Sequence, residues 1–118
     1  MKISKLASKK KVNNKMGGTY ERQAGETYGV QQVEDGVIFT ARCPAAVTVQ
    51  LAGDFNNWQP QQTPMRKVGD GVWKIKLPLS AGSYRYRLVV DGQWQHDPHN
   101  KATEPNPYGE LNSVLQVS

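Results

Sequence analysis

The feature that most limits the fold of this chain is a period-two alternation of apolar and polar residues, repeated in several short segments. In the first of them one face carries Val37, Phe39, Ala41 and Cys43. Side chains alternate between the two faces of a β-strand, whereas a helix repeats every 3.6 residues. No window of the sequence sustains the helical period. The pattern therefore predicts an all-β domain.

Three further segments extend this pattern. The first follows the Cys43-Pro44-Ala45 break at hairpin spacing, with a predicted inward face of Val47, Val49 and Leu51. The second follows the Gly69-Asp70-Gly71 turn, with an inward face of Trp73, Ile75, Leu77 and Leu79. The third ends at the Asp91-Gly92 turn, with Tyr84, Tyr86, Leu88 and Val90 inward and Arg85, Arg87 and Val89 outward.

The spacing of these segments predicts their assembly. A last apolar run at residues 114–117 can close a sheet, and turns recur about every ten residues. The stretch between Trp94 and Asn112 contains three prolines and is expected to be an extended loop. Several short strands joined in this way are typical of a two-sheet β-sandwich.

The charge is distributed unevenly along the 118 residues. Six lysines precede the first acidic residue, so the formal net charge of +5 leaves −1 for the remainder. Residues 1–26 are rich in Lys, Asn, Gly and Gln and lack apolar periodicity, which predicts a disordered tail. We therefore divide the chain into this tail and a module at residues 27–118. Nucleic-acid binding through the tail is an alternative that we do not favour, because no aromatic residues interleave its lysines.

Cysteine content and apolar runs favour a cytoplasmic location. Cys43 is the single cysteine, so no internal disulfide can form, and we expect a buried thiol. The basic start of the chain is not followed by the apolar segment of a secretory signal. No apolar run approaches the roughly 18 residues that a membrane-spanning helix needs.

Two tryptophans do not fit the inward registers. Trp58 lies in the Phe-Asn-Asn-Trp loop, and Trp94 follows the Asp91-Gly92 turn. An exposed indole can cover the C–H face of a pyranose ring while polar groups bind its hydroxyls. The polar groups close to these tryptophans in sequence are Asn56, Asn57, Gln59, Gln93 and Arg87. The alternatives are that the tryptophans pin loops to the sandwich or form a protein-docking surface.

Catalysis and metal binding receive no support from the sequence. Asp54, Asp91 and Asp97 occupy turn positions, where Asp usually accepts hydrogen bonds from backbone amides. His96 and His99 have H-x-x-H spacing, but Pro98 between them breaks helical geometry, and no further Cys or His completes a coordination shell. We expect neither an enzyme nor a cofactor.

Three ordered motifs carry a resemblance to a known family. They are LAGDFNNW at residues 51–58, YRLVVDGQWQHDP at residues 86–98 and NPYGELNSV at residues 106–114. Together they resemble the family 48 carbohydrate-binding modules, which bind starch and glycogen. Such modules occur in the β subunits of AMP-activated protein kinase and ahead of branching and debranching enzymes. The resemblance covers roughly residues 36–118.

The resemblance implies an immunoglobulin-like early-set sandwich that binds α-1,4-linked glucans without catalysis. It implies that Trp58 and Trp94 embrace consecutive glucose units, that Arg87 stands where the family has a lysine, and that Asn112 is the family's asparagine. The kinase modules have a leucine and a threonine where this chain has Tyr108 and Glu110. Tyr108 either stacks on sugar or belongs to a turn that holds the loop. A glucan-metabolising enzyme or a kinase is the implied partner, and a sandwich that docks such a partner without binding sugar is the alternative.

Overall fold

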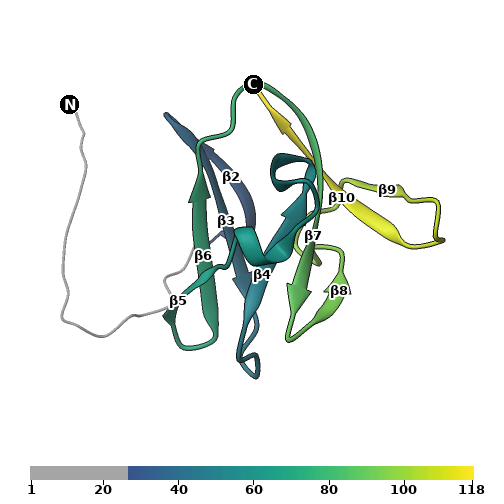
Figure 1. Cartoon of the computed structure of the whole chain (residues 1–118). Coiled ribbons are helices and arrows are strands. Elements are labelled where there is room, and N and C mark those ends of the chain that lie inside the picture. Colours follow the sequence, from purple (N-terminus) through teal and green to yellow (C-terminus); the bar gives the residue numbers. More distant parts are fainter. Residues whose placement is uncertain (1–26) are drawn as a thin grey trace, which may run out of the picture.

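A computed structural model describes residues 27–118, and the predicted tail lies outside this part of the chain. The described residues contain nine β-strands and two short 3-10 helices, labelled as in Figure 1. The strands of one sheet are β2 (Gly29–Val33), β3 (Gly36–Arg42), β6 (Val72–Leu77) and β5 (Arg66–Gly69). The strands of the other sheet are β4 (Val49–Gly53), β7 (Gly82–Val90), β10 (Leu111–Val117), β9 (Thr103–Pro105) and β8 (Gln93–Gln95). The 3-10 helices are η1 (Asp54–Asn56) and η2 (Pro60–Gln62).

The two sheets are antiparallel throughout and lie face to face (Figure 1). The first has the strand order β2-β3-β6-β5 and the second the order β4-β7-β10-β9. β8 pairs with the end of β7 beyond the part that pairs with β10. The expected all-β, immunoglobulin-like early-set sandwich is confirmed. No helix among the described residues is long and apolar enough to cross a membrane.

The core between the sheets is formed by the predicted inward faces. Its members include Val37, Phe39, Leu51, Trp73, Tyr86, Leu88 and Leu115. Phe39 contacts Tyr86 edge to face, with ring centroids 5.2 Å apart, a geometry that aromatic pairs prefer. Cys43 is half-buried against this cluster. Burial raises the pKa of its thiol, and the nearby carboxylates of Asp91 and Asp97 add to the effect. Both causes disfavour a reactive thiolate.

The expected hairpin between the first two predicted strands does not form. β3 pairs with β2 and β6, whereas β4 pairs with β7 in the opposite sheet. The connection between them crosses from one sheet to the other, and Val47 lies on this connection rather than in β4. Its side chain is 81% exposed, so the prediction that it faces the core is wrong. Short spacing permits a hairpin, but in the observed arrangement both strands face the core from opposite sheets, with Phe39 of β3 and Leu51 of β4 buried.

The outward face of β7 is also less exposed than predicted. Val89 is 3% exposed and Arg87 is 9% exposed, although both were expected to point to solvent. Val89 is the cross-strand neighbour of Trp94 on β8. Arg87 lies between the segments of β7 that pair with β10 and with β8. Side chains from other elements therefore cover this face, and they form the site described next.

Candidate functional site

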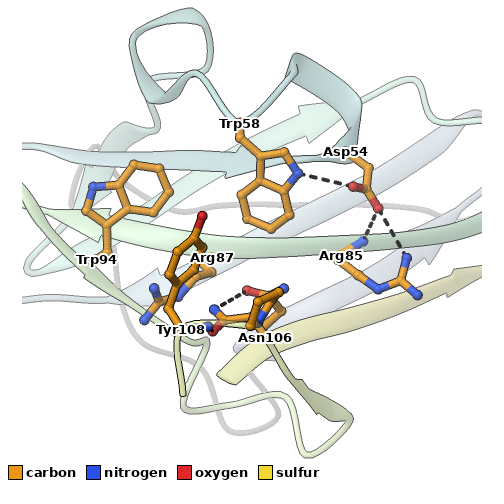
Figure 2. Close-up of a pocket in the computed structure, with 9 residues that line it drawn as sticks. Asp54, Trp58, Arg85, Arg87, Trp94, Asn106 and Tyr108 are labelled. Carbon is orange, nitrogen blue, oxygen red and sulfur yellow. Dashed lines mark hydrogen bonds and ion pairs between the residues drawn. The ribbon is translucent and has the colours of Figure 1, made fainter. Parts of the chain in front are cut away.

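A groove of about 560 Å³ crosses the outer face of the five-stranded sheet (Figure 2). Its volume falls in the range of ligand-binding pockets. Five predicted site residues line it, namely Trp58, Arg87, Trp94, Tyr108 and Asn112. Four residues that the sequence analysis did not select also line it, namely Asp54, Arg85, Asn106 and Pro107. Asn57 is exposed next to Trp58 but is not part of the lining. We call this feature the tryptophan groove.

Trp58 reaches the groove through an unusual backbone conformation. Asn57 and Trp58 both have positive φ angles, 56° and 60°. A left-handed conformation costs an L-residue about 1–2 kcal/mol, and it is rare for a residue as bulky as tryptophan. The turn is closed by the Trp58 amide, which donates to the Gly53 carbonyl at 2.9 Å. Such strain persists only where the surroundings hold the backbone in place.

Asn56 supplies much of this support. Its side chain is buried, and Oδ1 accepts hydrogen bonds from the amides of Gly53 (3.0 Å) and Gln59 (3.2 Å). Its Nδ2 donates to the Leu51 carbonyl and to the Thr63 hydroxyl. The expectation that Asn56 presents polar atoms to a sugar is therefore wrong. Its amide braces the loop from inside.

Gly53 allows the loop to start close to the neighbouring strand. A Cβ atom at this position would lie 2.6 Å from the Arg85 carbonyl oxygen and 2.8 Å from the Tyr86 Cβ. Contacts this short are excluded sterically, so only glycine fits between β4 and β7 here. The glycine of the Leu-Ala-Gly-Asp sequence thus lets η1 begin directly at the end of β4.

Asp54 connects the Trp58 indole to β7. Its Oδ1 accepts the indole Nε1 hydrogen bond at 3.2 Å, and its Oδ2 accepts the Arg85 backbone amide at 2.8 Å. The Arg85 guanidinium lies 3.9 Å from the same Oδ2. These contacts hold the indole edge and leave its rings facing the groove (Figure 2).

Trp94 is presented by the turn between β7 and β8. Asp91 and Gly92 have φ angles of 49° and 82°, as the tight turn of a two-residue hairpin requires. The Asp91 carboxylate accepts the amides of Val47 and Thr48, both at 2.8 Å. The hydrogen bond from Thr48, followed by that from Val47, lowers the pKa of Asp91. The turn is thereby anchored to the crossover between the sheets, and Trp94 remains 43% exposed.

Arg87 lies at the floor of the groove. Its Nη1 forms an ion pair with Glu110 at 2.7 Å. Its Nε is buried and has no hydrogen-bond partner within residues 27–118. An unpaired buried N–H costs about 1–3 kcal/mol. Within the described part of the chain, this nitrogen is therefore an unsatisfied donor beneath the groove.

Tyr108 is carried by the turn between β9 and β10 and is 88% exposed. The turn is braced by other residues. Asn106 Oδ1 accepts the amides of Tyr108 and Glu110, and Asn106 Nδ2 donates to Asn112 Oδ1 at 3.3 Å. The Glu110 ion pair ties the turn to β7. Because these contacts do not involve the phenol ring, the ring is left available beside Arg87 in the groove (Figure 2).

The charges in and around the groove nearly cancel. Arg85 and Arg87 contribute two positive charges, and each guanidinium is paired with carboxylates. The paired carboxylates are Asp54, Glu104 and Glu110. A groove with alternating donors and acceptors and no excess of positive charge suits neutral hydroxyl groups better than phosphate.

The three aspartates expected to serve turns do so. Asp54 and Asp91 accept backbone amides as described above, and Asp97 Oδ1 accepts the amide of His99. Asp97 is buried, and its Oδ2 accepts the Tyr86 hydroxyl at 2.7 Å. Burial, together with the Asp97 charge, raises the pKa of Tyr86. In residues 27–118 no group of three His, Cys, Asp or Glu side chains is placed to hold a metal ion.

Comparison with known proteins identifies related sequences. A family model described as the glycogen recognition site of AMP-activated protein kinase matches residues 42–118. A 1,4-alpha-glucan branching enzyme of Chlamydia pneumoniae is 33% identical over 96 residues, which are 76% of this chain. A second branching enzyme, from Thermosynechococcus vestitus, is 35% identical over 94 residues, or 75% of this chain. The β-1 subunit of AMP-activated protein kinase from Sus scrofa is 36% identical over 69 residues, or 58% of this chain.

The matched segments are only part of these relatives. They cover 13% and 12% of the two branching enzymes and 53% of the kinase subunit. The match to the family model includes β4 and all elements that line the tryptophan groove.

Proposed function

Because the chain belongs to the family of the glycogen recognition site of AMP-activated protein kinase, a family of carbohydrate-binding modules, we propose that its tryptophan groove binds α-1,4-linked glucans. The observation that carries this proposal is the convergence of two indoles from different elements on one electrically balanced groove. Glycogen, starch and maltooligosaccharides are the ligands that we propose.

Each site residue predicted from the sequence has a proposed role. Trp58 and Trp94 stack on consecutive glucose units, with C–H groups of the sugar against the indole faces. Arg87 and Asn112 bind hydroxyl groups from the floor. Tyr108 adds a third aromatic surface, because its exposed ring is not used by the turn that carries it. Asn57 reaches ligand hydroxyls from the rim beside Trp58.

We further propose that residues 27–118 act as a non-catalytic module. The carboxylates nearest the groove are engaged by backbone amides, an indole or arginines, which leaves no free acid and base pair across the groove. The module would direct a glucan-metabolising enzyme or a kinase to its polymer in the cytoplasm, with residues 1–26 as a separate tail. A polymer offers many equivalent sites, so weak binding suffices for this role.

The expected affinity is modest. Two stacking contacts and a few hydrogen bonds, less the cost of association, leave about 4 to 6 kcal/mol of binding free energy. Dissociation constants for single oligosaccharides should then be on the order of tens of micromolar to millimolar.

The test is a titration of tryptophan fluorescence with maltoheptaose, using cellohexaose as the β-linked control. Trp73 is buried in the core, so a change in emission would report on Trp58 or Trp94. We expect saturation with maltoheptaose alone. Trp58→Ala and Trp94→Ala should each weaken binding at least about tenfold with the fold intact. Val47→Ala, at an exposed position outside the groove, should bind as the wild type does.

Unchanged affinity in both tryptophan variants would refute the site assignment. A folded wild-type protein that responds to neither sugar would refute the glucan proposal itself. The remaining interpretation would be a sandwich that docks a protein partner through the same exposed aromatics.

A further inference from the structure

The tryptophan groove extends past Trp58 to a part of the sheet that the family resemblance did not select. In Figure 2, Trp94 lies at one end, Trp58 near the middle, and Asp54 with Arg85 at the other end. The same order follows from β7, where Trp94 pairs with Val89 and Arg85 lies on the far side of Arg87. Alternate residues of a strand are about 7 Å apart. This separation of Arg85 from Arg87 is roughly the width of one sugar ring.

Arg85 is held in place from two sides. Its Nε pairs with Glu104 Oε1 on β9, its Nη2 lies 3.5 Å from Glu104 Oε2, and its Nη1 lies 3.9 Å from Asp54 Oδ2. Its side chain is nevertheless about half exposed. A guanidinium fixed in this way loses little freedom when it donates its remaining N–H groups to a ligand.

The same contacts connect Arg85 to the stacking surface. Asp54 accepts hydrogen bonds from the Trp58 indole and from the Arg85 amide, so both groups are positioned by one carboxylate. A sugar ring next to the one stacked on Trp58 would meet guanidinium donors and carboxylate acceptors at this end of the groove. Hydroxyl groups both donate and accept, and therefore match this set.

The local charge argues against an anionic ligand here. Two carboxylates flank the single guanidinium, which leaves this end of the groove slightly negative. A phosphate or carboxylate substituent would be repelled by Asp54 and Glu104. The neutral hydroxyls of an unmodified glucan are not.

We propose that Arg85, positioned by Asp54 and Glu104, forms a polar subsite for a further glucose unit of the glucan, beyond the units stacked on Trp94 and Trp58. This inference rests on the glucan-binding function proposed above. The groove then contacts at least three consecutive units, and affinity rises with chain length until the Arg85 subsite is filled.

The experiment compares Arg85→Gln with the wild type for two ligands of different length. Maltose can occupy the two tryptophan positions without reaching Arg85, whereas maltoheptaose can fill all three. NMR titration measures the dissociation constants of both sugars, including values in the millimolar range. We expect Arg85→Gln to weaken maltoheptaose binding about five- to tenfold, as for the loss of one good hydrogen bond, and to leave maltose binding within about twofold.

Two further variants sharpen the result. Arg66→Gln removes one exposed arginine from β5 on the opposite sheet and should change neither constant. Glu104→Gln loosens Arg85 without removing it and should weaken maltoheptaose binding about two- to threefold, again without affecting maltose. Amide spectra of each variant show whether the fold is retained.

Equal weakening for both sugars would overturn the proposal, because Arg85 would then act only through Asp54 on Trp58. Unchanged maltoheptaose binding in Arg85→Gln would overturn it as well. If the wild type binds neither sugar, the glucan function fails and this inference fails with it. If the wild type binds maltoheptaose and Arg85→Gln binds it with the same affinity, the Arg85 subsite is refuted and the glucan-binding function stands.

Discussion

Asn56 and Asn57 are neighbours in the loop before Trp58, yet their side chains have opposite environments. Asn56 is buried and makes four hydrogen bonds that join β4, η1 and Thr63. Asn57 is exposed and adopts a left-handed conformation. The buried side chain of Asn56 therefore holds the loop through hydrogen bonds. The left-handed backbone of Asn57 allows the chain to turn so that Trp58 reaches the groove.

Replacement of Asn56 by alanine should destabilise the protein. The change leaves the Gly53 amide and the Leu51 carbonyl without their buried partner, which should cost about 2–4 kcal/mol of unfolding free energy. Glucan affinity should also fall, because Trp58 loses its support. Urea denaturation measures the first effect and a maltoheptaose titration the second. A loss below about 1 kcal/mol would contradict the bracing role.

Asn57 offers a test of backbone strain. Alanine at a φ of 56° should lower the unfolding free energy by about 1 kcal/mol, whereas glycine, which tolerates this angle, should not. Both variants remove the same amide, so both should weaken maltoheptaose binding to the same extent if that amide contacts sugar. Parallel denaturation and binding measurements separate the two effects. Equal stability of the two variants would argue against strain at this position.

At the scale of elements, β7 organises the site. One of its edges pairs with β4, and the other pairs with β10 and then with β8. Arg85, Arg87 and Val89 are its outward residues, and Trp94 follows directly on β8. The groove is therefore built on β7, and the loop after β4, strand β8, the β9–β10 turn and the start of β10 supply its other lining residues.

The Asp91 turn predicts how stability depends on pH. Its carboxylate accepts two amide hydrogen bonds, and the pKa of Asp91 is accordingly below its ordinary value. The unfolded chain then binds the proton more tightly than the folded one, so this stabilisation is present above the ordinary pKa and is lost as the pH falls through the lower, folded pKa. Asp91→Asn should be less stable than the wild type at about pH 7, and the difference should shrink towards about pH 2. Urea denaturation at both pH values checks this, and a constant difference would contradict it.

At the scale of the whole molecule, the two sheets have different outer surfaces. The five-stranded sheet carries the tryptophan groove, with its paired charges. The outer face of the other sheet includes the exposed cationic residues Arg66 and Lys76. The groove arginines are paired with carboxylates, and the positive formal charge of the chain comes from the six lysines that precede its first acidic residue, not from the residues where the ligand is proposed to bind.

This separation predicts that glucan binding is insensitive to salt. Neutral sugar bound by stacking and hydrogen bonds should show less than about a twofold change in affinity between about 0.05 and 0.5 M NaCl. Binding of nucleic acid through the lysine-rich segment would weaken steeply over the same range. Calorimetric titration of maltoheptaose at the two concentrations provides the measurement. A strong salt dependence would show that charged groups contribute more to sugar binding than the paired charges of the groove predict.

Much of the sandwich could be predicted from the sequence. Alternation identified the core residues Phe39, Leu51 and Tyr86, because the period of side-chain direction in a strand is a local property. Trp58 and Trp94 were found because they fall outside those registers, and both line the groove. Turn chemistry likewise indicated what the three aspartates do.

Arg85 occupies an outward position that could be predicted from the sequence, but its role at the groove could not be. It lies two residues before Arg87, so the alternation that placed Arg87 on the outward face placed Arg85 there as well. The carboxylates that hold it, Asp54 and Glu104, are far from it in the chain and gave no such signal.

The sequence by itself indicated five of the nine described strands (β3, β4, β6, β7 and β10), most of their inward faces and the residues left over for a site. It did not indicate β2, β5 or β8, and β9 lies in the stretch expected to be an extended loop. Only the tertiary structure decided that β3 and β4 separate into opposite sheets, that Arg87 and Val89 are covered, and that Asn56 is internal. The physical reason is that alternation records which way a side chain points. What lies in that direction depends on strands and loops distant in the chain, whose packing is settled by the burial of the whole molecule.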